Sequence, residues 1–493
     1  MDKIPQYIKD FSSGMITNIN ENLTPKNSVA LGINVDFDEE IGSAVTRLGS
    51  SLVNTLVAGK TVLGLHFYQH PTTPASNKLF GTVNDSGDAN ADIFDVVAGT
   101  VSLADDTKNL KTRFLTFLGS MLRVNGTDAP KAWTGSAWIT TAGVFDLANM
   151  PTGFKIVIEY LDRVYLMGKD ATPDLIQYSS TPFGSPLAVS WTVGNGSVNL
   201  EPEEGAGGIT GAGKVPGYLL IFKRHSMKRW NFVTANPESM VGIGTSSHES
   251  VVNAAGLCGF FSDSDPRAVG FYVTDGSYPV PISHLRAKNI RKWIDAIPSS
   301  FYENVSGYAT ETHMIWSIGD VTVDGKSYTN VQVRWSIKTG EWAVRYYPFG
   351  ARVFSKYVVS GVSTLVVGTT SGVVVKIDNP STFDDYPGAV PIPWEILTQE
   401  ETYGMNQIKE VSQRAIVSSR NLGPAEFYIV AGGSKGKKEA LSEPLKGDFA
   451  EISLKNAISG NYFQYGIRGM QKGSRATIKE IEIPNVAVKD KYV

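Results

Sequence analysis

One stretch of the chain, GGITGAGKV, comes close to a phosphate-binding loop. Gly208, Gly213 and Lys214 satisfy the spacing G-x-x-x-x-G-K, in which backbone N–H groups and the lysine would hold phosphates. Val215 stands where a Ser or Thr should bind magnesium, and Pro216 leads into an apolar run that predicts a strand rather than a helix. Without a helix N-terminus the anion cradle is missing, so we interpret the segment as a link into the next strand.

Nucleophile and metal signatures are equally incomplete. Gly432–Gly436 matches G-x-S-x-G, but the charged run KGKKEALSEPL follows it where a nucleophile elbow needs an apolar helix. Cys258 is the single cysteine and lies in the apolar run AAGLCGFF, which predicts a buried, inert thiol. The six histidines show no zinc-binding spacing. We therefore expect no cofactor, no metal and no enzymatic activity.

Carboxylates are the remaining candidates for chemistry. They gather in turn-like sequence, where aspartate commonly serves turns and solvation. A glycosidase could use two of them across the mouth of a propeller, but the sequence pairs none of them. The most acidic of these loops contain Glu201, Glu203 and Glu204, and Asp384 and Asp385.

Composition narrows the class of protein. The 493 residues carry a net charge of −3, which gives no global basic field for tight nucleic-acid binding. The N-terminal sequence MDKIPQYIKDF lacks the pattern of a signal peptide, and no apolar run approaches the roughly 20 residues of a membrane helix. We expect a protein made in a reducing cytoplasm without a membrane anchor.

The elements that would position any site follow a repeating plan. An apolar strand, a turn rich in Gly, Asn or Asp and a second strand recur about every 40 residues, often closed by a Trp. This rhythm, with little helix between the units, predicts an all-β fold built on a β-propeller. Seven blades are expected, with six as the competitor, near residues 59–103, 110–140, 152–192, 207–234, 251–283, 304–346 and 351–378.

One segment interrupts the strands with helical spacing. Leu285–Ile297 (LRAKNIRKWIDAI) places Ile290, Trp293, Ile294 and Ile297 on one face, and Pro298 should end the helix. The opposite face is basic. It carries Arg286, Lys288, Arg291 and Lys292.

Three regions are predicted along the chain. Residues 1–58 form a polar, turn-rich N-terminal segment, to which the family resemblance described below assigns contacts with adaptor or ring neighbours, and residues 59–395 form the propeller. Residues 396–493 contain five or more strand-like runs, which predict a β-sandwich-like domain.

Several of these stretches together resemble the tail nozzle proteins of short-tailed bacteriophages, also described as tail tubular protein B or packaged-DNA stabilisation proteins. The N-terminal run has the elements N-V-D-F (Asn34–Phe37) and R-L-G (Arg47–Gly49) in that order. GITGAGKVPGYLLIFKRHSMKRWNFV, GLCGFFSDSDPRAVGFYVTDGSYPVPISHLRAKNIRKWI and DRVYLMGKDATPDLIQYSSTPFGSP resemble blades of such proteins. The resemblance covers most of the first 380 residues as a pattern.

The resemblance implies a structural virion protein, made in the host cytoplasm and located in the tail. Its relatives form a ring, expected to be a hexamer, below the portal and adaptor proteins. They extend the channel for double-stranded DNA without sequence-specific binding, help retain the packaged genome and dock tail fibres or tailspikes. No catalytic residues are implied.

Two site hypotheses follow. The acidic loops with Glu201, Glu203, Glu204, Asp384 and Asp385 would line the channel and repel phosphate, and the basic face with Arg286, Lys288, Arg291 and Lys292 would contact a neighbouring subunit or adaptor. A virion-associated propeller glycosidase and a glycan-binding adhesion propeller remain the alternatives.

Overall fold

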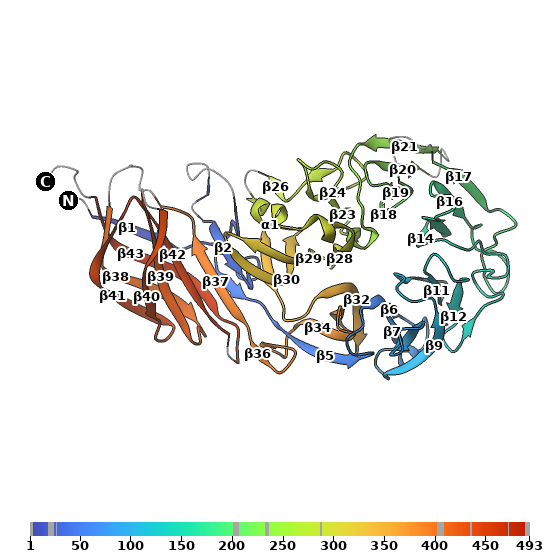
Figure 1. Cartoon of the computed structure of the whole chain (residues 1–493), viewed down its shortest axis with the longest axis horizontal. Helices are drawn as coiled ribbons and strands as arrows, with labels where there is room; N and C mark the ends of the chain where they lie inside the picture. Colours follow the sequence, from blue (N-terminus) through green and yellow to red (C-terminus); the bar gives the residue numbers. More distant parts are fainter. Residues whose placement is uncertain are drawn as a thin grey trace.

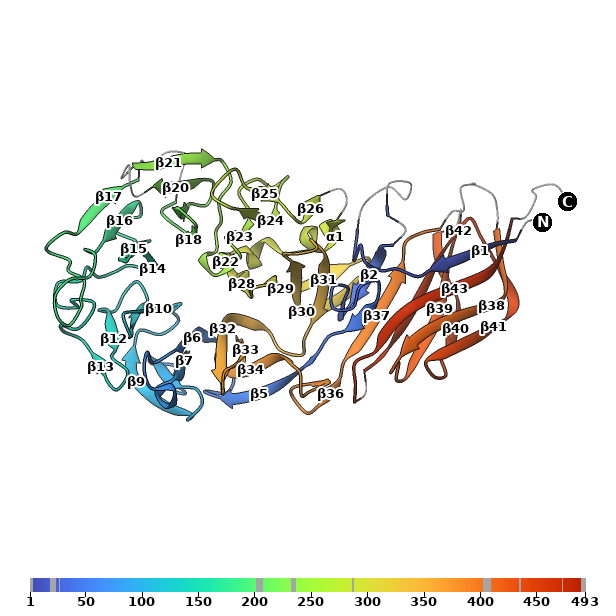
Figure 2. The same cartoon turned by 180° about the vertical axis from the view of Figure 1, so that it is seen from behind.

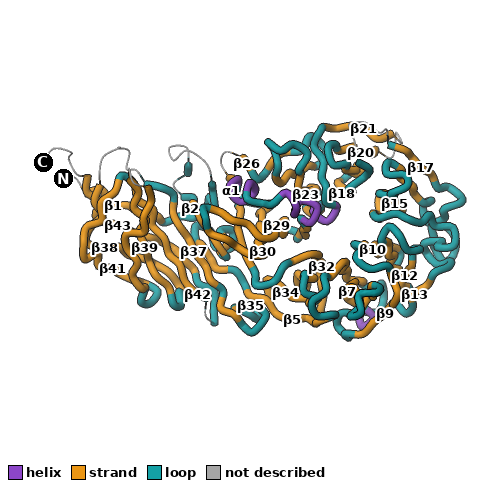
Figure 3. The backbone as a smooth tube through the Cα atoms, viewed as in Figure 1, coloured by secondary structure: helices purple, strands orange, loops and turns teal. Residues whose placement is uncertain are grey.

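The structure, a computed structural model, describes residues 3–17, 24–25, 27–200, 207–231, 236–285, 288–401, 409–433, 436–471 and 473–488. Strands dominate it, and helical segments are few and short (Figure 3). A propeller occupies one end of an elongated molecule and a β-sandwich the other, with both termini at the far end of the sandwich (Figure 1). The predicted all-β architecture of propeller and sandwich is confirmed.

Seven four-stranded units make up the propeller: six separate sheets, and four strands of a larger nine-stranded sheet. The innermost strands follow one another around a closed ring, in which β32 lies beside β6. The first four blades comprise β6 (Val62–Tyr68), β7 (Lys78–Asn84), β8 (Ala91–Asp95) and β9 (Thr100–Asp106); β10 (Arg113–Phe117), β11 (Ser120–Val124), β12 (Lys131–Trp133) and β13 (Trp138–Ile139); β14 (Ile156–Tyr160), β15 (Arg163–Met167), β16 (Leu175–Tyr178) and β17 (Gly196–Asn199); and β18 (Gly211–Val215), β19 (Tyr218–Phe222), β20 (Met227–Asn231) and β21 (Asn236–Val241).

The last three blades complete the circle, and the seventh takes its outer strand from the N-terminal segment. Because β5 pairs with β34, the two ends of the propeller sequence are joined in one sheet, which closes the ring. These blades comprise β22 (Val252–Ala254), β23 (Leu257–Ser262), β24 (Gly270–Thr274) and β25 (Val280–Pro281); β28 (Ser306–Ala309), β29 (His313–Val323), β30 (Lys326–Ser336) and β31 (Trp342–Tyr346); and β32 (Ala351–Val359), β33 (Val362–Thr369), β34 (Val373–Asn379) and β5 (Gly49–Thr55).

The recurring hairpin of the sequence has a physical cause in its turns. Among the described residues, five hairpins close through two residues that both have positive φ, as the type I′ turn requires to match the twist of the strands. These pairs are Leu118-Gly119, Leu161-Asp162, Ala255-Gly256, Asp324-Gly325 and Ser360-Gly361.

Apolar side chains pack between neighbouring blades. For example, Leu220 and Phe222 of the fourth blade meet Cys258, Phe260 and Tyr272 of the fifth in one buried cluster. The predicted inert thiol is buried there, and its burial raises the pKa of Cys258. The blades therefore stack on one another as slabs.

The C-terminal sandwich consists of two sheets that share a buried core with the fifth and sixth blades. One of its sheets is the outer half of the nine-stranded sheet, so hydrogen bonding runs without a break from the sixth blade through β2 to β40. The strands are β37 (Pro393–Thr398), β38 (Lys409–Arg420), β39 (Ala425–Gly433), β40 (Gly436–Pro444), β41 (Phe449–Gly460), β42 (Tyr462–Met470) and β43 (Thr477–Val488).

The N-terminal strands join these two parts. β1 (Lys3–Ile8) and β4 (Ala44–Thr46) pair with β43, while β2 (Val29–Ile33) bridges β31 and β37, and β3 (Val35–Asp36) pairs with β4. The described strands of residues 1–58 thus belong to sheets of the propeller and the sandwich, and the boundary expected after residue 395 falls inside β37. Figure 2 shows β1 in the sandwich, β2 between the two parts and β5 at the propeller.

The expected helix over Leu285–Ile297 is wrong in extent. A short hairpin of β26 (His284–Leu285) and β27 (Lys288–Asn289) takes its first part, and α1 covers only Arg291–Asp295. Ile290, Trp293, Ile294 and Ile297 are buried as the apolar spacing indicates. The remaining short elements are the 3₁₀ helices η2 (Pro74–Ser76), η3 (His248–Ser250) and η4 (Ser299–Asn304), and the hairpin of β35 (Asp384–Asp385) and β36 (Val390–Pro391).

Candidate functional site

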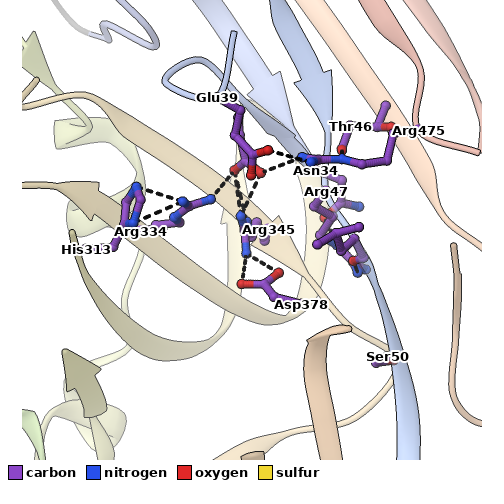
Figure 4. A network of polar contacts seen from close by, with 12 residues as sticks. Asn34, Glu39, Thr46, Arg47, Ser50, His313, Arg334, Arg345, Asp378 and Arg475 are labelled. Atoms are coloured by element: carbon purple, nitrogen blue, oxygen red, sulfur yellow. Dashed lines mark hydrogen bonds and ion pairs between the residues drawn. The ribbon is translucent and has the colours of Figure 1, made fainter. Parts of the chain in front are cut away.

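Two groups of paired charges inside the fold stand out, and the first holds the propeller to the sandwich. Asp36 of β3 accepts two hydrogen bonds of 2.7 Å from Arg345 Nη2, and it lies 3.0 Å from Arg334 and 3.4 Å from Arg475 (Figure 4). Arg345 also donates to Asp378 at 2.7 and 2.8 Å. We call these residues, with Arg47 and Asp385, the ionic junction.

Arg47 extends the ionic junction to the strand that closes the propeller. Its guanidinium pairs with Asp385, donates to Asn34 Oδ1 at 2.9 Å and lies 4.0 Å from the centre of the Tyr347 ring. Ser50 donates to Asp385 at 2.9 Å. The junction therefore ties the N-terminal segment to the sixth and seventh blades and, through Arg475, to the sandwich.

Electrostatics keeps the ionic junction charged although it is buried. Burial alone would raise the pKa of Asp36, but the positive charges of Arg345, Arg334 and Arg475 outweigh burial and hold that pKa far below its usual range. Burial likewise opposes the charge of Arg345, and Asp36 and Asp378 raise its pKa. Each buried charge has a partner, which is the arrangement of a structural ion network.

The second group lies in the central channel of the propeller. Glu249 of η3 accepts hydrogen bonds from Lys111 Nζ at 2.9 Å and from Arg113 Nε at 2.9 Å and Nη2 at 2.5 Å. Lys111 also donates to the Glu303 carbonyl at 2.9 Å, and Arg113 to the Lys155 carbonyl at 2.6 Å. These contacts join four blades across the channel axis, and we call Lys111, Arg113 and Glu249 the channel plug.

The pKa values of titratable groups in and around the channel plug are strongly lowered. Burial opposes the charge of Glu249, yet Arg113 and Lys111 lower its pKa far below the usual range. Burial and the charges of Arg113 and Lys111 lower the pKa of His248 to about 3, and its Nδ1 accepts from the Ala212 amide at 3.2 Å. Burial, helped by Lys356, lowers the pKa of His66 to about 4. Both imidazoles are therefore neutral at pH 7.

This chemistry differs from that of a glycosidase. A general acid needs a carboxyl group whose pKa is raised, so that it holds a proton at neutral pH. Glu249 is ionised and held by two cations, which is the opposite condition. Over the described ranges, no group of three or more His, Cys, Asp or Glu side chains is arranged to hold a metal ion.

The structure separates the predicted acidic residues. Glu201, Glu203 and Glu204 lie outside the described residues. Asp384 is half-buried on β35, whereas Asp385 is buried and paired with Arg47. The expectation that Asp385 lines a channel is therefore corrected, because its carboxylate belongs to the ionic junction and does not reach solvent.

The predicted basic face is only partly described. Arg286 and the side chain of Lys288 lie outside the described residues. Arg291 pairs with Asp295 at 2.7 Å on the same helix, and Lys292 pairs with Asp324 at 3.1 Å. Both described cations are thus already paired on this chain, at the surface.

The near-miss phosphate loop has a packing role. Gly213 lies in β18, and a Cβ added there would sit 2.7 Å from Cys258 Sγ. Lys214 pairs with Glu159 at 2.7 Å. Ser434, the centre of the G-x-S-x-G match, lies outside the described residues.

Sequence reasoning missed both charge groups. Of the ionic junction, Asp36 and Arg47 are recognised in the sequence only as parts of N-V-D-F and R-L-G, and Asp385 is assigned there to a channel surface. The contacts of the junction explain Asn34, Asp36 and Arg47, and close packing explains Gly49, where a Cβ would lie 2.3 Å from the Asp384 carbonyl oxygen. No local spacing signals the channel plug, whose members come from distant blades.

Comparisons with known proteins add little. No protein-family model and no curated protein match the chain. Among solved structures, "YCF48 bound to D1 peptide" is 11% identical, with a TM-score of 0.39, and the match covers 71% of this chain and 98% of that one. "Structure of U3-55K" is 8% identical, with a TM-score of 0.42, over 67% and 98% of the two chains. Likeness at this level carries no argument about function.

Proposed function

We propose that this chain is a structural subunit of the tail nozzle of a short-tailed bacteriophage. In this proposal a ring of copies, expected to be six, continues the DNA channel below the portal and adaptor proteins, helps retain the genome and docks fibres or spikes. The proposal starts from the sequence resemblance, and one structural observation supports it most: the propeller and the sandwich are built as a single body.

That observation rests on backbone pairing and buried charge together. A nine-stranded sheet crosses from the sixth blade into the sandwich, and strands from the N-terminal segment enter both parts. The ionic junction closes the same region with paired charges. A wall that contains pressurised DNA needs such rigidity more than it needs a catalytic pocket, because a hinge would open the wall.

Strand edges offer a way to form the ring. The sheet with the order β3-β4-β43-β38-β41 ends at β41 on one side, while β1 pairs with β43 on the other. Pairing of the β41 edge of one copy with the β1 edge of the next would be a heterologous contact, which closes into a ring when its rotation fits. Phe449, at the start of β41, is 68% exposed in the single chain.

The basic face gives a second expected contact. Arg291 and Lys292 sit beside the junction of propeller and sandwich, and their pairs with Asp295 and Asp324 are exposed ones that a neighbour could replace. The loop with Glu201, Glu203 and Glu204 remains the candidate for the channel surface, where acidic groups would let DNA slide.

Sedimentation of the purified chain tests this assignment. The double variant Arg291→Glu, Lys292→Glu should weaken assembly, because each reversal sets a carboxylate against the neighbour's complementary charge. The matched control is Lys108→Glu, Lys214→Glu, two exposed lysines of the propeller that lie outside α1 and outside the sheet with the β41 and β1 edges. Equal assembly of both variants would remove the basic face from the interface.

The channel plug gives the glycosidase alternative no support, because the pKa of Glu249 is lowered and its carboxylate cannot act as a general acid at neutral pH. The adhesion alternative has one observation in its favour, a cavity with a largely polar set of lining residues beside that plug.

A further inference from the structure

A cavity of about 590 Å³ opens beside the channel plug. Its lining comes largely from residues at or just before the first strands of blades, so it lies at the face where the innermost strands begin. Its volume lies within the range of small-molecule sites. The polar lining residues are Thr61, Asn109, Ser300, Asn304, Ser317, Asp320, Asn330, Arg352 and Thr370.

Arg352 is the cationic member of this lining and Asp320 its anionic member, but among the described residues no hydrogen bond or ion pair joins the two side chains. It lines both the cavity and the narrow gap beside Lys111 and Glu249. Within the described residues no hydrogen bond or ion pair is made by Arg352, and Glu249 acts on it only through space. The oxygens of Glu249 are already held by Lys111 and Arg113, so three cations share one carboxylate.

This imbalance marks a place for an anion. Burial lowers the pKa of Arg352, and the charge of Glu249 offsets only part of that effect. The guanidinium remains charged and half-buried, with its donors unused. A carboxylate can accept two parallel hydrogen bonds from such a group.

The rest of the lining is suited to hydroxyl groups. Asn330 is held in place, because its amide donates to Asp320 at 2.7 Å and its Nδ2 to the Tyr347 carbonyl at 3.2 Å, which leaves Oδ1 as an acceptor. Asp320 can accept further donors. Phe301 adds an aromatic surface beside Gly319, where a Cβ would lie 2.7 Å from its ring.

We infer that this cavity binds a sugar acid, with its carboxylate on Arg352, its hydroxyls on the surrounding amide and hydroxyl side chains, and its C–H face against Phe301. An extended acidic peptide fits less well, because it would need a strand edge or a long groove rather than a cavity with a single cation. The channel plug supplies no protonated acid, so the sugar is bound and not cleaved. The inference goes beyond the nozzle assignment, since one chain suffices for it.

Calorimetric titration of the purified full chain tests this assignment. The probes are D-glucuronate, D-glucose, inorganic phosphate and a short Asp/Glu peptide, each at the same ionic strength. We expect glucuronate to bind at least about tenfold more tightly than glucose, because the site otherwise leaves Arg352 unpaired. Arg352→Gln should lower glucuronate affinity by about tenfold or more. The affinity of Arg352→Lys should lie between those of the wild type and Arg352→Gln, because lysine keeps the positive charge but loses the two parallel N–H donors of the guanidinium.

Arg267→Gln is the matched control, since Arg267 is an exposed arginine outside the cavity. It should leave the affinity unchanged. Asn304→Ala should lower the affinity for glucuronate without altering the midpoint of thermal unfolding. The two measurements together separate an effect on binding from an effect on folding. Absence of glucuronate binding, or equal binding by the wild type and Arg352→Gln, overturns the inference. Tighter binding of phosphate or of the peptide overturns its assignment to a sugar acid. Each readout is independent of ring formation.

Discussion

The ionic junction is centred on buried charges and the channel plug on partly buried ones, and the two groups differ in how completely their charges are matched. In the junction each arginine that meets Asp36 also has a second carboxylate: Arg345 has Asp378, Arg334 has Asp38 at 4.0 Å, and Arg475 has Glu39. Arg47 has Asp385. Around the plug, Glu249 serves two cations by contact and a third, Arg352, only through space.

This difference separates structure from binding. A fully matched network is rigid and gains nothing from a ligand, whereas an unmatched cation beside a cavity gains from any fitting anion. The junction therefore explains how the propeller and the sandwich are held together as one body, and the cavity beside the plug is where a ligand is expected.

The largest expected effect comes from breaking the ionic junction. Arg345→Met leaves Asp36 and Asp378 buried without their main partner, and should lower the free energy of unfolding by about 3–5 kcal/mol. Chemical denaturation measures it. Arg414→Met removes an exposed pair with Glu451 and should lower the free energy by less than about 1 kcal/mol. Similar losses in the two variants would contradict the structural role of the junction.

As pH falls, the stabilisation from the two histidines in the centre of the propeller should be lost before that from the ionic junction. The pKa values of His66 and His248 in the folded chain, about 4 and about 3, lie below the unfolded value, so the unfolded state takes up protons first. Their contribution is complete above the unfolded pKa of about 6.5 and falls as pH drops toward 4, by up to about 1.4 kcal/mol per pH unit for each histidine. The contribution of Asp36 to the free energy of unfolding is complete above about pH 4 and is lost only below it, because the pKa of Asp36 is lowered in the folded chain.

Unfolding midpoints recorded between pH 7 and pH 4.5 check this order. The double variant His66→Gln, His248→Gln should flatten the dependence, since neither side chain then titrates. A wild type that keeps its midpoint down to pH 4.5, or a double variant that loses as much, would argue against neutral channel histidines.

Removing the charge of Glu249, which contacts two cations, should destabilise the fold more than removing that of Arg352, which contacts no carboxylate. Glu249→Gln leaves Lys111 and Arg113 without a carboxylate and should lower the free energy of unfolding by about 2 kcal/mol. Arg352→Gln removes a cation without a contact partner and should change it by no more than about 0.5 kcal/mol. Denaturation of the two variants side by side measures the contrast, and a larger loss for Arg352→Gln would reverse the interpretation.

The sequence predicts the propeller well because its signal is local. Each blade depends on short strands and on turns such as Leu118-Gly119 and Ser360-Gly361, so the seven predicted units nearly coincide with the observed sheets. The helix was overextended because its apolar spacing is real, while the backbone pairing of His284 with Asn289 cannot be read from side-chain type.

The sites could not be predicted in the same way, because their members meet only through the fold. Arg47 and Asp385 are 338 positions apart, and Arg113 and Glu249 are 136 apart. Asp385 looks like a solvated acidic loop in the sequence, and only ring closure by β5 buries it. The route of the N-terminal strands through both parts likewise depends on contacts that no local pattern contains.

The central claim is that copies of this rigid chain form the wall of a DNA channel. Electron microscopy of the purified protein, with class averages taken along the particle axis, tests it most directly. The account predicts closed rings with sixfold symmetry and a central opening wide enough for double-stranded DNA. Particles that remain single elongated chains at every concentration, with the propeller and sandwich visible as one unassembled body, would contradict it.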